Sequence, residues 1–221
     1  MTMLLAVENL LSPGQTVALR DAAAALRFQD GRKTAGRFAA EVKANDQAEP
    51  SAQLDAIVAQ AEQALATNAL FTSATRPAAM TRLILSRYRA GQTYGLHVDD
   101  AMMSGLRTDV SFTLFLSDPE TYDGGALIIE DSFEQRAVKL PAGSLFLYPS
   151  TTLHRVEPVA AGERLAIVGW VQSSIRRADQ REILFDLDRA VAQVHADTGK
   201  SALFDSLAKS RSNLIRMWAA S

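Results

Sequence analysis

The chain has 221 residues, of which 48% are hydrophobic, which suits one large folded domain and excludes global disorder. The formal net charge is −2 and no basic run occurs, so a general nucleic-acid binder is not expected. The chain has no cysteine, which excludes disulfide scaffolds, zinc–thiolate sites and cysteine nucleophiles.

The first residues do not read as a targeting signal. They contain a short apolar run without the basic region that precedes such a run in a signal peptide. No stretch of the chain approaches the roughly 18 apolar residues that cross a bilayer. A cytoplasmic protein without a membrane partner is therefore the expectation.

Two helices are predicted in the first third of the chain. A Ser-Pro pair opens the first, which should run from Pro13 to about Arg27. After a turn at residues 30–36, residues 37–43 read as a short strand. Residues 51–67 form an amphipathic helix. Its apolar positions recur at helical spacing and are Leu54, Ile57, Val58, Ala61 and Leu65.

The middle of the chain is rich in short runs typical of β-strands. These runs cover residues 81–88, 108–116, 125–131, 143–149 and 164–172. Turn signals separate them, such as Asp-Gly-Gly before the third run and Pro-Ala-Gly before the fourth. Regularly spaced short strands with tight turns predict a β-sandwich or barrel.

Helical spacing returns after the last of these runs. One apolar stripe comprises Ile183, Leu187, Ala190, Val191 and Val194, and a second comprises Leu203, Leu207, Leu214 and Trp218. We expect both helices to pack on the barrel, and a stripe left exposed would offer a surface for a homo-oligomer. The predicted architecture is mainly β with flanking helices. A domain at residues 1–174 has its N-terminal helices packed on the barrel, and residues 175–221 form a C-terminal helical extension.

Two of the three histidines lie in the β-rich region and suggest a metal site. His97 and Asp99 are two positions apart, so in a strand their side chains would point to the same face, whereas Asp100 would point to the other. His154 follows the fourth predicted strand. Two imidazoles and one carboxylate on one face of a metal leave three octahedral positions open, which is the arrangement of iron(II) oxygenases.

Arg164 is a second unusual residue of the predicted interior. Strand alternation places it on one face with Ala166, Val168 and Trp170, and the small or apolar character of 166 and 168 suggests an inward face. A buried guanidinium needs an anion, and its planar fork suits a carboxylate. Pairing with an acid of the protein is the alternative, although the adjacent Glu163 would point away.

With these residues in view, the chain resembles the PKHD-type hydroxylases, bacterial relatives of the catalytic domain of prolyl and lysyl hydroxylases. The resemblance covers nearly the whole chain. It is carried by DGRKTAG, RYRAGQTYGLHVDDAM, RTDVSFTLFLSDPETYDGGALIIED, VKLPAGSLFLYPSTTLHRVEPV and GWVQSSIRR. It implies a double-stranded β-helix, a jelly-roll barrel that holds iron at its open end.

The resemblance also assigns roles to single residues. Carried over by position, it makes His97, Asp99 and His154 the iron ligands. Arg164 would anchor the distal carboxylate of 2-oxoglutarate. Tyr88 matches a tyrosine that contacts the same carboxylate in related prolyl hydroxylases, and a core aromatic is the alternative for this residue.

The implied activity is that of an Fe(II)- and 2-oxoglutarate-dependent dioxygenase, which uses O2 to hydroxylate a substrate and releases succinate and CO2. The resemblance also suggests ascorbate as a reductant for the iron. The substrate is not given, and a protein side chain, a free amino acid and an iron-chelating small molecule are all open. Two other functions fit the metal residues: a cupin-like metalloenzyme of another reaction type, and a non-catalytic sensor of iron or 2-oxoglutarate.

Other polar and aromatic residues are predicted to line the pocket or to lie on solvated helix faces. Tyr94 and Trp170 are candidates for shaping the substrate side of the pocket, with ordinary barrel packing as the alternative. His195 lies in the C-terminal helical region and reads as a solvated helix residue. Basic and acidic residues alternate after the barrel and predict a solvated helix face with Arg176, Arg177 and Arg181.

Overall fold

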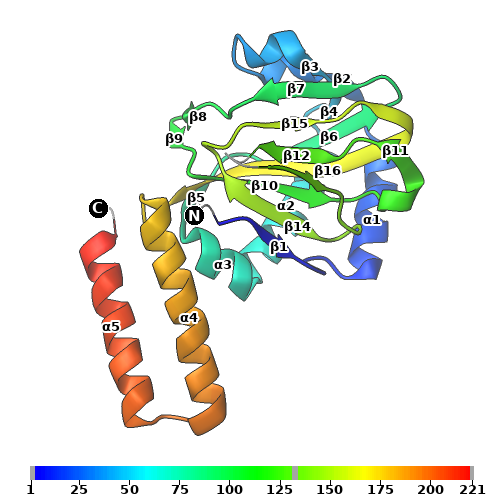
Figure 1. Cartoon of the computed structure of the whole chain (residues 1–221). Helices are drawn as coiled ribbons and strands as arrows, with labels where there is room; N and C mark the ends of the chain where they lie inside the picture. The colour runs from blue at the N-terminus through cyan, green and yellow to red at the C-terminus, as the bar shows by residue number, and fades with distance from the viewer. Residues whose placement is uncertain (1–2, 131–133, 220–221) are drawn as a thin grey trace.

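Two antiparallel sheets face each other and form the centre of the molecule (Figure 1). The computed structural model describes residues 3–130 and 134–219, so the last residue of the run predicted at 125–131 lies outside the described residues. Each of the five predicted runs contains a strand. This pair of sheets is the predicted jelly-roll barrel, in which side chains from two inner faces meet.

The larger sheet contains, in the order of their pairing, β1 (Leu5–Val7), β14 (Leu145–Pro149), β10 (Val110–Phe115), β16 (Val159–Ser173), β6 (Ile84–Arg89), β4 (Asp46–Ala48) and β2 (Phe28–Asp30). Two further strands pair with β16, namely β5 (Pro77–Met80) and β11 (Tyr122–Gly124). The smaller sheet contains β13 (Gln135–Val138), β12 (Leu127–Glu130), β15 (His154–Val156), β7 (Thr93–His97) and β3 (Lys43–Ala44). A separate pair is formed by β8 (Met102–Met103) and β9 (Leu106–Arg107).

Three helices from the N-terminal part cover the outer face of the larger sheet: α1 (Pro13–Ala24), α2 (Ala52–Thr67) and α3 (Ala69–Thr75). The predicted helix start is confirmed, because the Ser12 hydroxyl accepts from the Gln15 N–H at 3.3 Å and the Gln15 side chain accepts from the Ser12 N–H at 2.9 Å. The helix ends at Ala24, short of the predicted Arg27. The prediction for residues 51–67 is confirmed by α2.

Apolar side chains fill the space between these helices and the larger sheet. Phe71 of α3, for example, meets Phe112 of β10 edge-on, with 5.8 Å between the ring centroids. A smaller apolar cluster lies between the two sheets and includes Tyr88, Phe115 and Leu127. Because the main core lies outside the barrel, the space between the sheets also takes several polar side chains, which form the site described below.

The strand predicted at residues 37–43 is mostly wrong. Residues Ala39–Val42 form a 3-10 helix, and the strand β3 begins only at Lys43, which pairs with Tyr94 of β7. The sequence Ala-Ala-Glu-Val is poor in residues that favour strands, so nothing local extends the pairing. The short helix instead packs on β7, where the β-carbon of Val42 lies against Gly95.

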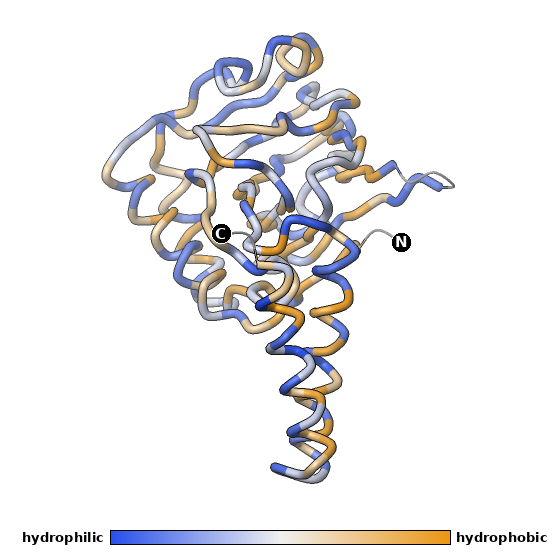
Figure 2. Tube along the Cα trace, turned by 90° about the vertical axis from the view of Figure 1, so that its left-hand side faces the viewer, coloured by the Kyte–Doolittle hydropathy of each residue, from blue (hydrophilic) through white to orange (hydrophobic). Residues whose placement is uncertain are grey.

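The two C-terminal helices, α4 (Ala178–Thr198) and α5 (Ala202–Trp218), form a hairpin that projects from the barrel (Figure 1). The expectation that both pack on the barrel is wrong for most of their length. In α4 only Arg181, Leu184 and Phe185, near its start, are buried, and α5 has no buried residue within its described length. Instead, α4 and α5 lie against each other, and apolar residues recur along both arms (Figure 2). Ile183 and Leu203 of the predicted stripes are exposed. None of the described helices is long and apolar enough to cross a membrane.

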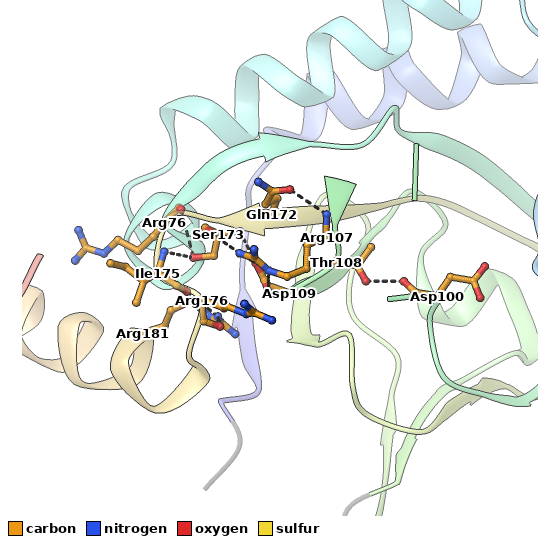
Figure 3. Close-up of polar contacts among 10 residues, drawn as sticks. All are labelled: Arg76, Asp100, Arg107, Thr108, Asp109, Gln172, Ser173, Ile175, Arg176 and Arg181. Atoms are coloured by element: carbon orange, nitrogen blue, oxygen red, sulfur yellow. Dashed lines mark hydrogen bonds and ion pairs between the residues drawn. The ribbon is translucent and has the colours of Figure 1, made fainter. Parts of the chain in front are cut away.

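Arg181 is a correction to the predicted solvated helix face. Arg176 and Arg177 are exposed as predicted, but Arg181 is only 4% exposed. Its guanidinium donates to the carbonyl oxygens of Ile175 and Arg176 at 2.9 and 2.8 Å, in the segment between β16 and α4 (Figure 3). The helix turns this residue back onto the preceding backbone, which alternation of charge along the sequence does not reveal.

Candidate active site

A pocket lies between the two sheets at one end of the barrel. Both sheets and the N-terminal segment around residues 34–47 supply its walls. The polar residues among its lining are Thr34, Lys43, Asn45, Gln47, Ser86, Tyr88, Tyr94, His97, Asp99, Asp100, Thr113, Tyr148, His154, Arg164 and Trp170. All of the site residues predicted from the sequence are therefore in this one cavity.

His97, Asp99 and His154 converge within the pocket. One potential ligand atom from each lies within 4.8 Å of the others. His97 at the end of β7 stands directly opposite His154 at the start of β15, and their ring centroids are 4.2 Å apart. The His154 Nε2 is 3.8 Å from an Asp99 carboxylate oxygen. These three side chains are close enough to share one ion.

A β-bulge in β7 aligns the aromatic residues beside this cluster. Between the pairs Tyr94–Val156 and His97–His154, β7 has one residue more than β15. Simple alternation would place Tyr94 and His97 on opposite faces, but the extra residue brings both to the inner face. Their rings stack with centroids 3.6 Å apart. Tyr94 thus lines the pocket, as the sequence suggested.

Both histidines are held in the form that binds metals. The Nδ1–H of His97 donates to the Gly95 carbonyl at 2.8 Å, and that of His154 donates to the Thr152 carbonyl at 2.9 Å. A carbonyl oxygen only accepts, so each Nδ1 carries a proton, and the neutral form of each ring then has its lone pair on Nε2. Burial and the neighbouring His154 lower the pKa of His97 to about 4, which keeps it neutral at neutral pH.

A hydrogen bond from a serine of the larger sheet fixes the orientation of the Asp99 carboxylate. Its side chain is only 6% exposed, and the Ser111 hydroxyl of β10 donates to it at 2.6 Å. A second hydrogen bond of 2.8 Å joins the hydroxyls of Ser111 and Ser150. One carboxylate lone pair accepts the serine proton, and the remaining lone pairs are left for a cation.

Asp100 does not belong to the cluster, but it is not remote from the pocket either. Its carboxylate lies against Gly36 at the pocket wall, although the sequence predicted that it points away. Its carbonyl oxygen accepts from the Thr108 hydroxyl at 2.6 Å (Figure 3). The adjacent residues Arg107 and Asp109 pair and bind Ser173 at the end of β16, so the loop after Asp99 is tied to the larger sheet.

Arg164 is buried in the pocket wall and is 1% exposed. Its guanidinium carbon lies 5.3 Å from the ring centroids of both Tyr88 and Phe115, and its Nε has no hydrogen-bond partner. No acidic side chain in residues 3–130 and 134–219 forms an ion pair with it. Glu163 points away, as predicted, and approaches Arg87 at 3.8 Å. A buried guanidinium of this kind is suited to an anion supplied from outside the chain.

Tyr88 stands opposite Arg164 in the pairing of β6 with β16. It is 4% exposed, belongs to the apolar cluster between the sheets and also lines the pocket. Burial raises the pKa of its hydroxyl, so it stays a neutral donor. Tyr88 is therefore both an aromatic residue of the core and a residue of the pocket wall, which were the two interpretations made from the sequence.

Sequence reasoning missed Lys43. This residue is 8% exposed and lines the pocket. Its ammonium lies 4.9 Å from the centroid of the Tyr94 ring and donates to the Thr34 hydroxyl at 3.3 Å. Burial lowers the pKa of Lys43 to about 8. No local signal could have found it, because only the pairing of β3 with β7 brings it inside.

Trp170 and His195 differ in their relation to the pocket. Trp170 lines it, and its buried indole N–H has no hydrogen-bond partner among the described residues. His195 is exposed in the C-terminal hairpin, where it packs on Phe204 with 5.0 Å between ring centroids. The prediction that this third histidine is a solvated helix residue is confirmed.

Comparison with known proteins identifies the family. Residues 83–172 match the model of the 2OG-Fe(II) oxygenase superfamily, and residues 179–220 match that of the PKHD-type hydroxylase C-terminal domain. A PKHD-type hydroxylase of Maricaulis maris is 46% identical over 98% of this chain and 99% of its own length. One of Parvibaculum lavamentivorans is 50% identical over 86% of this chain and 87% of its own. The chain belongs to the PKHD-type hydroxylases.

Solved structures show the fold of this PKHD-type hydroxylase in more distant proteins. A Pseudomonas putida prolyl-4-hydroxylase superposes with a TM-score of 0.53 at 21% identity, over 78% of this chain and 94% of its own. A Trichoplax adhaerens prolyl hydroxylase gives 0.56 at 16% identity, over 79% and 86%. At such identities these likenesses concern the jelly-roll fold alone.

Family membership decides between the functions that the metal residues left open. The 2OG-Fe(II) oxygenases use Fe(II) and 2-oxoglutarate, and the protein is an oxidoreductase of this class, a 2-oxoglutarate-dependent hydroxylase. This favours the hydroxylase over a cupin-like enzyme of another reaction type and over a non-catalytic sensor. The donor set fits the metal, since two imidazoles and one carboxylate are typical ligands of non-haem iron.

Proposed function

We propose that His97, Asp99 and His154 hold the iron, and that Arg164 with Tyr88 binds the distal carboxylate of 2-oxoglutarate. One observation supports both roles. Two imidazoles with their Nδ1 protons bound to carbonyls and one carboxylate lie within 4.8 Å of one another, in a pocket whose wall also carries a buried guanidinium. The substrate that is hydroxylated stays open at this stage.

The iron and its cosubstrate supply the oxidising chemistry, in which 2-oxoglutarate and O2 give succinate, CO2 and a hydroxylated product. The protein supplies position. Arg164 can bind a carboxylate with two parallel hydrogen bonds, and its burial strengthens these bonds. Ser111 fixes the orientation of Asp99, and the stacked ring of Tyr94 fixes that of His97.

We also propose that ascorbate is the reductant that keeps the iron active. Counting the turnovers of the enzyme with and without ascorbate tests this.

We further propose that the dioxygenase domain comprises residues 1–174 and that residues 175–221 form an extension. The two family models support this division, because one ends at residue 172 and the other begins at 179.

We propose that two copies associate through the hairpin, which exposes Ile183, Leu203 and Met217. Sedimentation should show a dimer that M217K weakens, and a monomer at all concentrations would contradict it.

The metal assignment predicts the effect of H97A. The variant should lose succinate formation from 2-oxoglutarate under Fe(II), together with binding of Mn(II) measured by electron paramagnetic resonance, because one of three ligands is gone. H195A is the matched control, since this histidine lies in the hairpin. S111A should weaken Mn(II) binding by roughly 10–100-fold, because Asp99 loses its orienting donor. Unchanged Mn(II) binding by H97A would contradict the assignment.

The cosubstrate assignment predicts the effect of R164A. The KM for 2-oxoglutarate should rise by roughly 30-fold or more, since losing a buried charge-assisted contact costs on the order of 2–5 kcal/mol. Mn(II) binding should change little. R155A is the control, because Arg155 is next to His154 in sequence but pairs with Glu130 at 2.8 Å. An equal rise in KM for both variants would count against the assignment of Arg164.

A further inference from the structure

The pocket contains a second buried cation, Lys43, for which the metal and the cosubstrate give no role. Its ammonium has three protons to donate. Within the described residues one hydrogen bond is formed, to the Thr34 hydroxyl at 3.3 Å, and no carboxylate lies within ion-pair distance. A buried ammonium is costly unless an anion or several acceptors meet it. Lys43 therefore has donors left for a ligand.

The surroundings of Lys43 differ from those of Arg164. Lys43 belongs to β3 at the edge of the smaller sheet, beside Tyr94 and the N-terminal segment with Thr34. Arg164 belongs to β16 in the larger sheet, beside Tyr88 and Phe115. The two cations thus lie on different walls with no neighbour in common among these contacts. Each is placed to meet a separate group.

2-Oxoglutarate cannot use both cations in the proposed binding mode. Its two ends are occupied, one at the metal residues and one at Arg164. The Tyr94 ring contacts both the Lys43 ammonium, 4.9 Å from its centroid, and the His97 ring, whose centroid is 3.6 Å away. A molecule held by Lys43 would therefore lie beside the metal centre, where the hydroxylated substrate must bind.

We infer that the substrate of this hydroxylase carries a carboxylate, which Lys43 binds with its two unused donors. This inference rests on the proposed function, because it assumes that Arg164 takes the cosubstrate. Among the substrate classes left open by the sequence, it selects those with a free carboxylate beside the C–H bond to be oxidised. It assigns substrate selection to the segment at residues 34–47, which precedes the strands that carry the metal residues.

The test uses bromide as an anion probe that X-ray anomalous scattering can locate. Crystals of the full chain with Mn(II) and N-oxalylglycine, an unreactive analogue of 2-oxoglutarate, are soaked in sodium bromide. We expect a bromide beside the Lys43 ammonium in the unsubstituted protein and none there in K43M. K33M is the control, because Lys33 is exposed nearby and donates to Gln29.

The outcomes separate this inference from the proposed function. Mn(II) on the three metal residues and N-oxalylglycine on Arg164, without bromide at Lys43, would overturn the inference alone. A carboxylate of N-oxalylglycine on Lys43, or bromide that remains at this position in K43M, would also overturn it. Absence of Mn(II) from the metal residues, or of the analogue from Arg164, would instead overturn the proposed function.

Discussion

Lys43 and Arg164 illustrate how differently two buried cations behave. A guanidinium stays charged at any pH that a protein survives, so a buried Arg164 needs an anion or several hydrogen-bond acceptors. An ammonium can lose its proton, and burial lowers the pKa of Lys43 to about 8. At neutral pH both are charged within one cavity, and both should lower the stability of the empty protein.

The K43M variant should accordingly be more stable than the natural protein at pH 7. A pKa lowered from 10.5 to about 8 corresponds to a cost of about 3 kcal/mol. The unfolded chain binds the proton more tightly, so the cost is fully present below about pH 8 and is relieved as the pH rises toward 10.5. Methionine removes it at every pH.

Urea unfolding at several pH values measures this effect. The difference in the free energy of unfolding between K43M and the natural protein should shrink between pH 8 and 10.5. K33M should show no such difference, because Lys33 is exposed. A K43M variant that is less stable at pH 7 would show that the ammonium is well satisfied in the folded protein.

At the scale of single elements, the turn after β11 positions Arg164. Gly125 has a φ of +64°, a conformation that side chains disfavour. A β-carbon there would lie 2.9 Å from a methyl carbon of Val159 and 3.3 Å from Cδ of Arg164. The absence of a side chain at Gly125 thus lets β16 and the stem of Arg164 approach the turn.

The G125A variant should therefore raise the KM for 2-oxoglutarate by roughly tenfold, because small displacements of a positioning group are costly. Steady-state succinate release measures the change. G105A is the matched control: its φ is +80°, but a β-carbon there meets nothing within 4 Å. In G105A the added β-carbon causes the same type of backbone strain but does not contact another residue. Equal KM values for the two variants would exclude a role for crowding at Arg164.

At the scale of the whole molecule, one carboxylate joins the projecting hairpin to the rest. Asp188 of α4 accepts from Ser73 and Arg76 at the end of α3 and from Arg211 of α5. Although burial opposes it, these hydrogen bonds hold the pKa of Asp188 below its usual range. The group is charged at neutral pH, and its contribution is lost as the pH falls below the ordinary carboxylate value of about 3.9.

The D188N variant should loosen the hairpin while leaving the barrel folded. The two arginines lose their charged partner, which we expect to cost about 1–3 kcal/mol after allowance for partial exposure. Hydrogen exchange should become faster in α5, whose described residues are not buried, and change little in β10 and β16. D186N is the control, because Asp186 is exposed. Uniformly faster exchange in barrel and hairpin would contradict this local role.

Residue patterns alone determined much of this protein. Alternation in the strands predicted the inward face with Arg164. The spacing of His97 and Asp99 predicted that their side chains meet, as they do, although Asp99 lies beyond the end of β7 and not within the strand. The sequence also predicted the cap at Ser12, the helix α2 and the C-terminal helices, because caps and helical periodicity depend on residues within one element. The family was recognisable from motifs spread along the chain.

Only the tertiary structure decided which elements become neighbours. The pairing of β3 with β7 buries Lys43, and the bulge in β7 turns Tyr94 onto His97. The hairpin packs on itself, and Arg181 turns back onto the backbone before α4. The physical reason is the same in each case. Local periodicity fixes the face of an element on which a side chain lies, whereas burial and charge pairing depend on what other part of the chain covers that face.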